Sequence, residues 1–167
     1  MKRIIVGLLT TLLFLGCSSK ESVETDIEPM LVVGKNMAAF TLNDQHEKPH
    51  SIAANTKTLI FAFSKDIGHT CNEFFATKSD SYLSDNNALF IADVSAAPSI
   101  IKSMFIMPGL KEFKHPVLII DDESVSKAYK SGQDDEKIII VFMKDKTITA
   151  IKPVSTNLEL AASIEAK

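Results

Sequence analysis

The chain has 167 residues, of which 46% are hydrophobic and 23% charged, and a formal net charge of -3. This is the length of about one domain and the composition of a folded protein rather than a disordered one. Two cysteines, Cys17 and Cys71, are too few for a disulfide scaffold or a cysteine-rich zinc module. The acidic balance excludes a basic nucleic-acid-binding surface, and the scattered glycines form no phosphate-binding loop, so we expect neither nucleic acid nor a nucleotide cofactor.

The N-terminal residues 1–16 have the pattern of a bacterial export signal. Lys2 and Arg3 precede an apolar run at residues 4–15, which is too short for a membrane span of about 20 residues. The run ends just before Cys17, a pattern that resembles the lipobox of bacterial lipoproteins, in which the signal is cut before a cysteine that then carries lipid. A plain secretory signal that is cut elsewhere is the alternative.

The lipobox resemblance implies a membrane anchor through lipid, such as palmitate, on Cys17. Because residue 18 is Ser and not Asp, it also implies sorting to the outer membrane, facing the periplasm. Residues 17–32 are polar and acidic, as expected for a flexible tether, and residues 33–167 are predicted to form the folded domain. Removal of the signal takes away the only arginine, Arg3, and leaves Cys71 as the single free thiol.

Hydrophobic patterning predicts strands and helices in alternation along the domain. A short hairpin is expected first, at residues 39–43 and 49–52. The further expected strands are residues 57–64, 88–95, 116–121, 137–144 and 147–152. The expected helices are residues 71–84, 98–107, 123–130 and 158–166, the second stopped by Pro108-Gly109 and the last capped by Asn157.

This order of elements predicts an α/β domain in three layers with a mixed central sheet. It resembles the thioredoxin-like superfamily, and the additional strand and helix at residues 116–130 resemble the insertion that peroxiredoxins carry. Within the superfamily the chain is most similar to the YtfJ family of bacterial envelope proteins, through the stretch from Ile91 to Asp121, which includes His115-Pro116, and the acidic loop at residues 133–136. That resemblance implies an envelope protein of undefined activity and no particular substrate.

Reactive chemistry, if any, is expected at Cys71. Thr70 and Glu73 have the spacing of a capping box, so Thr70 would cap a helix and Cys71 would lie in its first turn. Backbone N–H groups and the helix dipole would then stabilise a thiolate and lower the pKa of the thiol, with His69 or Thr70 assisting. The other interpretation is that Cys71 is a small apolar residue packed at the start of the helix.

The comparison with redox families favours a domain that has lost part of the usual chemistry. Peroxiredoxins carry Pro-x-x-x-Thr-x-x-Cys, whereas this chain has Ser64 and Gly68 at the first two positions and keeps only Cys71. Thioredoxins carry Cys-x-x-Cys, and Gly68 replaces the first cysteine here. The leading hypothesis is therefore an accessory, partner-binding domain, and the alternative is a one-cysteine thiol peroxidase in which Cys71 is the nucleophile.

No metal site is predicted. His46 and His50 fall in a polar loop and are expected to be solvated, and His115, before a proline at a strand start, is expected to be structural. The run from Met104 to Met107 is too continuous for one face of a helix. Most of it is expected in the core, with part as an exposed patch that docks a partner.

Overall fold

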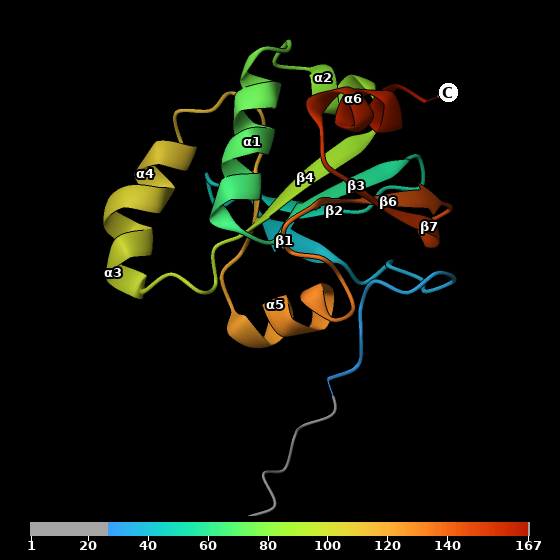
Figure 1. Cartoon of the computed structure of the whole chain (residues 1–167), viewed down its shortest axis with the longest axis horizontal. Helices are drawn as coiled ribbons and strands as arrows, with labels where there is room; N and C mark the ends of the chain where they lie inside the picture. The colour runs from blue at the N-terminus through green and yellow to red at the C-terminus, as the bar shows by residue number, and fades with distance from the viewer. Residues whose placement is uncertain (1–26, 167) are drawn as a thin grey trace, which may run out of the picture.

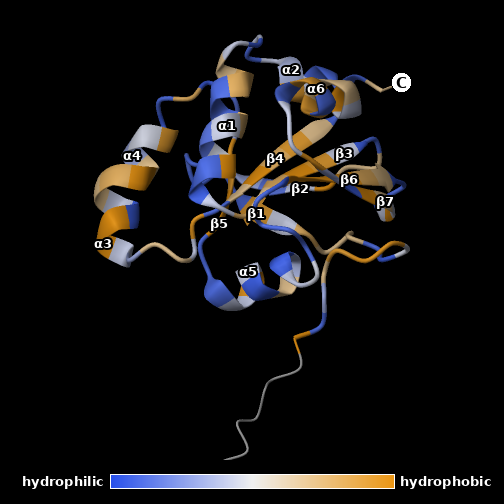
Figure 2. Cartoon of the chain, viewed as in Figure 1, coloured by the Kyte–Doolittle hydropathy of each residue, from blue (hydrophilic) through white to orange (hydrophobic). Residues whose placement is uncertain are grey.

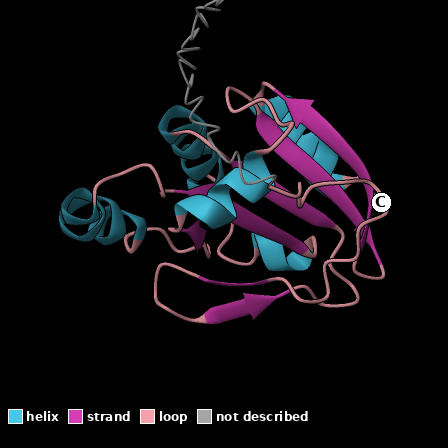
Figure 3. Cartoon of the chain, turned by 90° about the horizontal axis from the view of Figure 1, so that it is seen from below, coloured by secondary structure: helices cyan, strands magenta, loops and turns pink. Residues whose placement is uncertain are grey.

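The computed structural model describes residues 27–166, and the expected signal and Cys17 lie outside the described residues. Helices cover both faces of a central sheet (Figure 1), and in the view from below helix α5 lies across the sheet while a separate helical segment stands to one side (Figure 3). Within residues 27–166, no helix has the length and apolar character required to cross a membrane. The predicted α/β class and three layers are confirmed.

The sheet has five strands in the order β5-β4-β3-β6-β7. The central strand β3 pairs in parallel with β4 and antiparallel with β6, so the expected mixed sheet is confirmed. A right-handed crossover through helices is the usual way to join parallel strands, and helices do lie between them. The single helix predicted at residues 71–84 is wrong, because the structure has two helices there, Lys65–Ala76 and Tyr82–Asp85. The strands are β3 (Thr58–Ala62), β4 (Ala88–Asp93), β5 (Leu118–Ile120), β6 (Ile138–Lys144) and β7 (Thr147–Val154).

Alternating side chains of β3 enter two separate cores, because successive residues of a strand point to opposite faces. Ile60 and Ala62 pack under α1 (Lys65–Ala76), α2 (Tyr82–Asp85) and α6 (Asn157–Glu165). Leu59 and Phe61 face α5 (Glu123–Lys130) and the chain from residue 30 to residue 40. Met30 packs against this second core and Leu31, which is 3% exposed, belongs to it.

Two helices have the caps that their sequences encode. The Asp122 side chain accepts hydrogen bonds from the backbone N–H groups of Ser124 and Val125, and α5 has the predicted bounds. Helix α6 begins at Asn157 rather than after it, because the cap is Thr156, whose side chain accepts from the backbone N–H of Glu159 in a complete capping box.

The helix expected at residues 98–107 does not stop at Pro108. It continues as α3 (Ser99–Ile101), a π-helical turn η1 (Lys102–Ile106) and α4 (Met107–Leu110). In the wide turn the backbone N–H of Met107 donates to the carbonyl of Lys102, five residues earlier. Pro108 then lies in the first turn of α4, where the lack of an N–H group is tolerated, so the predicted stop is wrong.

Other segments cover the two edges of the sheet. The predicted hairpin is present as β1 (Thr41–Asn43) and β2 (Pro49–Ser51), and the loop between them lies against β5. There the Gln45 side chain accepts from the backbone N–H of Val117 at 2.8 Å and donates to the carbonyl of His115 at 2.9 Å. At the opposite edge, residues 34–37 form backbone hydrogen bonds with Lys146 and Ile148, at the start of β7.

Candidate functional site: an apolar groove beside a buried cysteine

The expected position of Cys71 in a first helical turn is wrong. Helix α1 begins at Lys65 with Ser64 as its cap, so Cys71 lies in the middle of the helix. The Thr70 hydroxyl donates to the carbonyl of Asp66 at 3.0 Å, as hydroxyls inside helices do, and caps nothing. The turn that could stabilise a thiolate holds Lys65, Asp66 and Ile67 and contains no cysteine.

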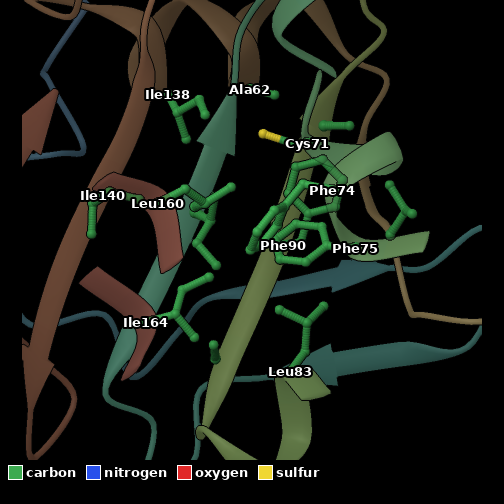
Figure 4. Packing of buried hydrophobic residues seen from close by; sticks show 14 of the residues in the cluster. Ala62, Cys71, Phe74, Phe75, Leu83, Phe90, Ile138, Ile140, Leu160 and Ile164 are labelled. Carbon is green, nitrogen blue, oxygen red and sulfur yellow. The ribbon is translucent and has the colours of Figure 1, made fainter. Parts of the chain in front are cut away.

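The Cys71 thiol is sealed in the core. Its exposed fraction is 0%, and its sulfur points toward Ala62 and Ile138 on the sheet (Figure 4). Phe74 and Phe75, on the same face of α1, complete the apolar surroundings. Burial disfavours the charged thiolate and raises the pKa of the Cys71 thiol to about 12, the opposite of the lowered pKa that the sequence suggested.

The other two predicted site residues do not contact the thiol through any hydrogen bond. The Thr70 hydroxyl donates to the backbone carbonyl of Asp66 instead, and the His69 side chain is exposed. The three consecutive residues therefore point in different directions, as successive residues of a helix must. The structure does not assemble His69, Thr70 and Cys71 into a catalytic group.

A groove of about 640 Å³ opens beside the first half of α1. Its walls come from α1, from the chain that follows β4, and from residues 97–113, with α5 closing one end. The groove therefore lies beyond the carboxyl ends of the parallel strands β3 and β4, where ligands of open α/β sheets usually bind. A volume of this order is typical of small-molecule pockets, which span roughly 300–1,000 Å³.

The helical segment 99–110 forms the outer wall of the groove and is rich in hydrophobic residues (Figure 2). Phe105 is 65% exposed, Met104 61% and Ile100 63%, while Leu110 is the only buried residue of the segment. The prediction that most of the Met104–Met107 run is core is wrong, and the predicted exposed patch is present.

Along α1, the groove is lined by Lys65, Gly68, His69 and Asn72. These residues recur at intervals of three and four and so form one stripe along the helix. Lys65 forms no ion pair with any residue that the structure describes. Across the groove, the carboxylate of Asp93 is already occupied, because it accepts from the Ser126 hydroxyl at 2.5 Å and from a backbone N–H.

Asn72 links the groove to a buried histidine. Its side chain is 5% exposed, and its Oδ1 lies 2.9 Å from Nε2 of His115. His115 is packed against Phe75 and Phe113, and burial lowers the pKa of its imidazole to about 4. His115 is thus a neutral donor to Asn72 at neutral pH and agrees with the structural role expected for it.

The remaining histidines form no metal centre. The expectation of a solvated His50 is wrong, since its Nε2 lies 2.8 Å from Oδ2 of the buried Asp44. Burial opposes ionisation of Asp44, but hydrogen bonds from His50 and from the backbone of Lys48 and His46 hold the pKa of the carboxyl below its usual value. Between residues 27 and 166, no cluster of three or more His, Cys, Asp or Glu side chains could hold a metal ion.

Comparison with solved structures assigns a thioredoxin-like fold to the domain. The pneumococcal exposed lipoprotein thioredoxin of Streptococcus pneumoniae superposes with a TM-score of 0.52 at 11% identity, covering 77% of this chain and 98% of that one. Reduced Prx3 of Vibrio vulnificus gives 0.50 at 14% identity, with 81% and 99% covered. No protein-family model and no curated protein sequence matches the chain. Identities this low establish the fold and nothing about activity.

Sequence reasoning missed the groove because its parts are far apart in the chain. Lys65, Asp93 and Phe105 come from three separate elements, and only the fold brings them to one place. Two signals were available. The continuous apolar run at residues 104–107 does not fit one helix face, and Gly68 interrupts a helix that otherwise needs no glycine.

Proposed function

We propose that the chain is a lipid-anchored protein of the bacterial cell envelope whose thioredoxin-like domain has lost redox chemistry and instead binds a partner in the groove beside α1. The anchor is the lipid on Cys17, and the location is the periplasmic face of the outer membrane, as the sequence implies. The resemblance to the YtfJ family of envelope proteins belongs to the same proposal. The domain acts as an accessory module rather than as an enzyme.

One observation carries this proposal. The first turn of α1, where this fold places a reactive thiol, holds Lys65, Asp66 and Ile67, while the only thiol of the domain is inside the core at Cys71. A groove lined mainly by apolar residues nevertheless remains open at the same turn. A site that keeps its binding surface and lacks its nucleophile is suited to binding without turnover.

The thiol peroxidase alternative would need Cys71 to meet peroxide. A sulfur with no exposed surface and a thiol pKa near 12 gives almost no accessible thiolate at neutral pH. Formation of a sulfenic acid would also require an external thiol to reduce it, since residues 27–166 contain no second cysteine. Both points weigh against this alternative.

A crosslinking experiment in membranes tests the proposal. A photoreactive amino acid at position 105 should capture the occupant of the groove, and the same amino acid at position 152, on β7, serves as the control. Labelling with palmitate should depend on Cys17, with Cys17→Ala as the unlabelled control. Absence of a specific adduct at position 105, or peroxide consumption that Cys71→Ala abolishes, would contradict the proposal.

A further inference from the structure

The groove contains a glycine that the chain itself does not require. Gly68 lies inside α1 with an ordinary helical backbone, and a Cβ built on it would meet nothing within 4 Å. Glycine in a helix interior costs about 0.5–1 kcal/mol relative to alanine. Across the groove, Gly109 of α4 also has open space at its missing Cβ. Neither a turn nor a tight internal contact explains these two residues.

Glycine that is not needed for the backbone is typical of positions where an external molecule comes close to a helix. Gly68 lies on the groove side of α1, between Lys65 before it and Asn72 after it. A side chain here would fill the part of the groove that these two residues flank. The missing Cβ therefore leaves room for an occupant against the helix.

The polar groups beside Gly68 are donors. The ammonium of Lys65 forms no ion pair within the described residues, and the Ser64 cap uses no side-chain hydrogen bond, so the first N–H groups of α1 are not capped either. Oδ1 of Asn72 is occupied by His115, and its amide nitrogen has no hydrogen-bond partner in residues 27–166. No buried side-chain nitrogen or oxygen of the described residues lacks a hydrogen-bond partner. The unpaired amide nitrogen of Asn72 must therefore be accessible, and it opens on the groove that Asn72 lines.

Three charged side chains line the groove, those of Lys65, Asp93 and Lys130. Asp93 accepts from Ser126 and from the backbone N–H of Ser95. Lys130, at the α5 end, forms an ion pair with Asp135 at 2.8 Å and is neutralised by it. Asp93 keeps its negative charge across the groove, and Lys65, at the start of α1, is the lining cation that pairs with no carboxylate of the described residues.

The opposite wall is apolar. Ile101, Phe105 and Ile106 from the helical segment, with Leu110 and Phe113, face the stripe on α1. No residue in this set can donate or accept a side-chain hydrogen bond, so this wall suits a hydrocarbon chain. The groove thus has an anion-binding side and a hydrocarbon-binding side.

We propose that the groove binds an amphipathic carboxylate with a single aliphatic chain, the head group resting over Gly68 between Lys65 and Asn72, and the chain lying against Phe105 and its neighbours. This inference rests on the proposed function, since it names the chemical class of the occupant of the same groove. Gly68 gives the head group its access, and Lys65 supplies the charge. The exposed apolar surface of residues 99–110 is then covered when the site is filled.

Binding of three decyl compounds to the full chain tests the head group. Decanoate, decanol and decyltrimethylammonium share one hydrocarbon chain and differ in charge, and amide shifts in NMR spectra report their affinity and place. We expect decanoate to bind best, and octanoate about fifteenfold more weakly, because each buried methylene contributes about fourfold in affinity. Lys65→Met should reduce decanoate affinity about fivefold and leave decanol unchanged, with the exposed Lys152→Met as the control.

A variant that fills the groove tests whether decanoate binds there. Gly68→Leu should abolish decanoate binding while keeping the fold, since its side chain has open space and leucine is a better helix former than glycine. If all three compounds bound with equal affinity and Gly68→Leu abolished their binding, the groove would be a binding site but its preference for an anionic head group would be overturned. Absence of binding by every compound would overturn the inference, while an adduct at position 105 in membranes would still support the proposed function.

Discussion

Alkylation of Cys71 provides a quantitative test of the buried thiol. At pH 8, a thiol of pKa about 12 is about 0.01% thiolate, whereas a free thiol of pKa about 8.5 is about one quarter thiolate. Because only the thiolate reacts, iodoacetamide should modify Cys71 about 2,000-fold more slowly in the folded protein than in urea. The rate should rise about tenfold for each pH unit between pH 7 and pH 9, without a plateau.

The assay follows the peptide that contains Cys71 by mass spectrometry, so that Cys17 does not interfere. A plateau in the rate below pH 8.5, or a rate within tenfold of that in urea, would refute the assignment of Cys71 to the core. The raised pKa also has a thermodynamic consequence. The folded thiol holds its proton above the unfolded pKa of about 8.5, so stability should fall as pH rises beyond that value, and Cys71→Ala should remove this part of the fall.

Three further predictions concern stability and can be measured by urea unfolding. The imidazole of His115 has a pKa of about 4 in the folded protein against about 6.5 in the unfolded chain, so its contribution to stability is complete above pH 6.5 and lost as pH falls toward 4. His115→Gln should remove up to about 3 kcal/mol of this acid sensitivity. Identical profiles of unfolding free energy against pH for the two proteins would contradict it. Gln45→Ala should cost about 1–3 kcal/mol, since it leaves the buried N–H of Val117 unpaired, and a cost under about 0.5 kcal/mol would argue against that contact. Thr156→Ala should cost about 1 kcal/mol through loss of the cap, and an unchanged midpoint would mean that the capping box contributes nothing.

The fold could be predicted from the sequence because its signals are local. The apolar run at residues 137–144 forms an interior strand that is buried on both faces. Asp122 is a capping residue in the sequence and caps α5 in the structure. These patterns indicate where elements form and, through their order, which sheet they build. The mixed sheet and the alternation of strands and helices follow directly.

The candidate site could not be predicted from such signals. Thr70 and Glu73 have capping-box spacing by coincidence, and Ser64 begins the helix without making the side-chain bond that would mark a start. The burial of Cys71 was encoded instead by its helical spacing to Phe74 and Phe75, whose faces pack on the sheet. Capping-box spacing locates the start of a helix only when the apolar stripe of that helix does not continue before the predicted cap.

The covered edges of the sheet restrict how this domain can associate with other molecules. Gln45 and its loop occupy the β5 edge, and residues 34–37 pair with the start of β7, whose remainder carries Lys152 and Pro153. A free edge would offer backbone groups to any extended chain, including a second copy. With both edges obstructed, copies of this domain are protected from joining strand to strand. Recognition by this domain then has to act through side chains and surface shape.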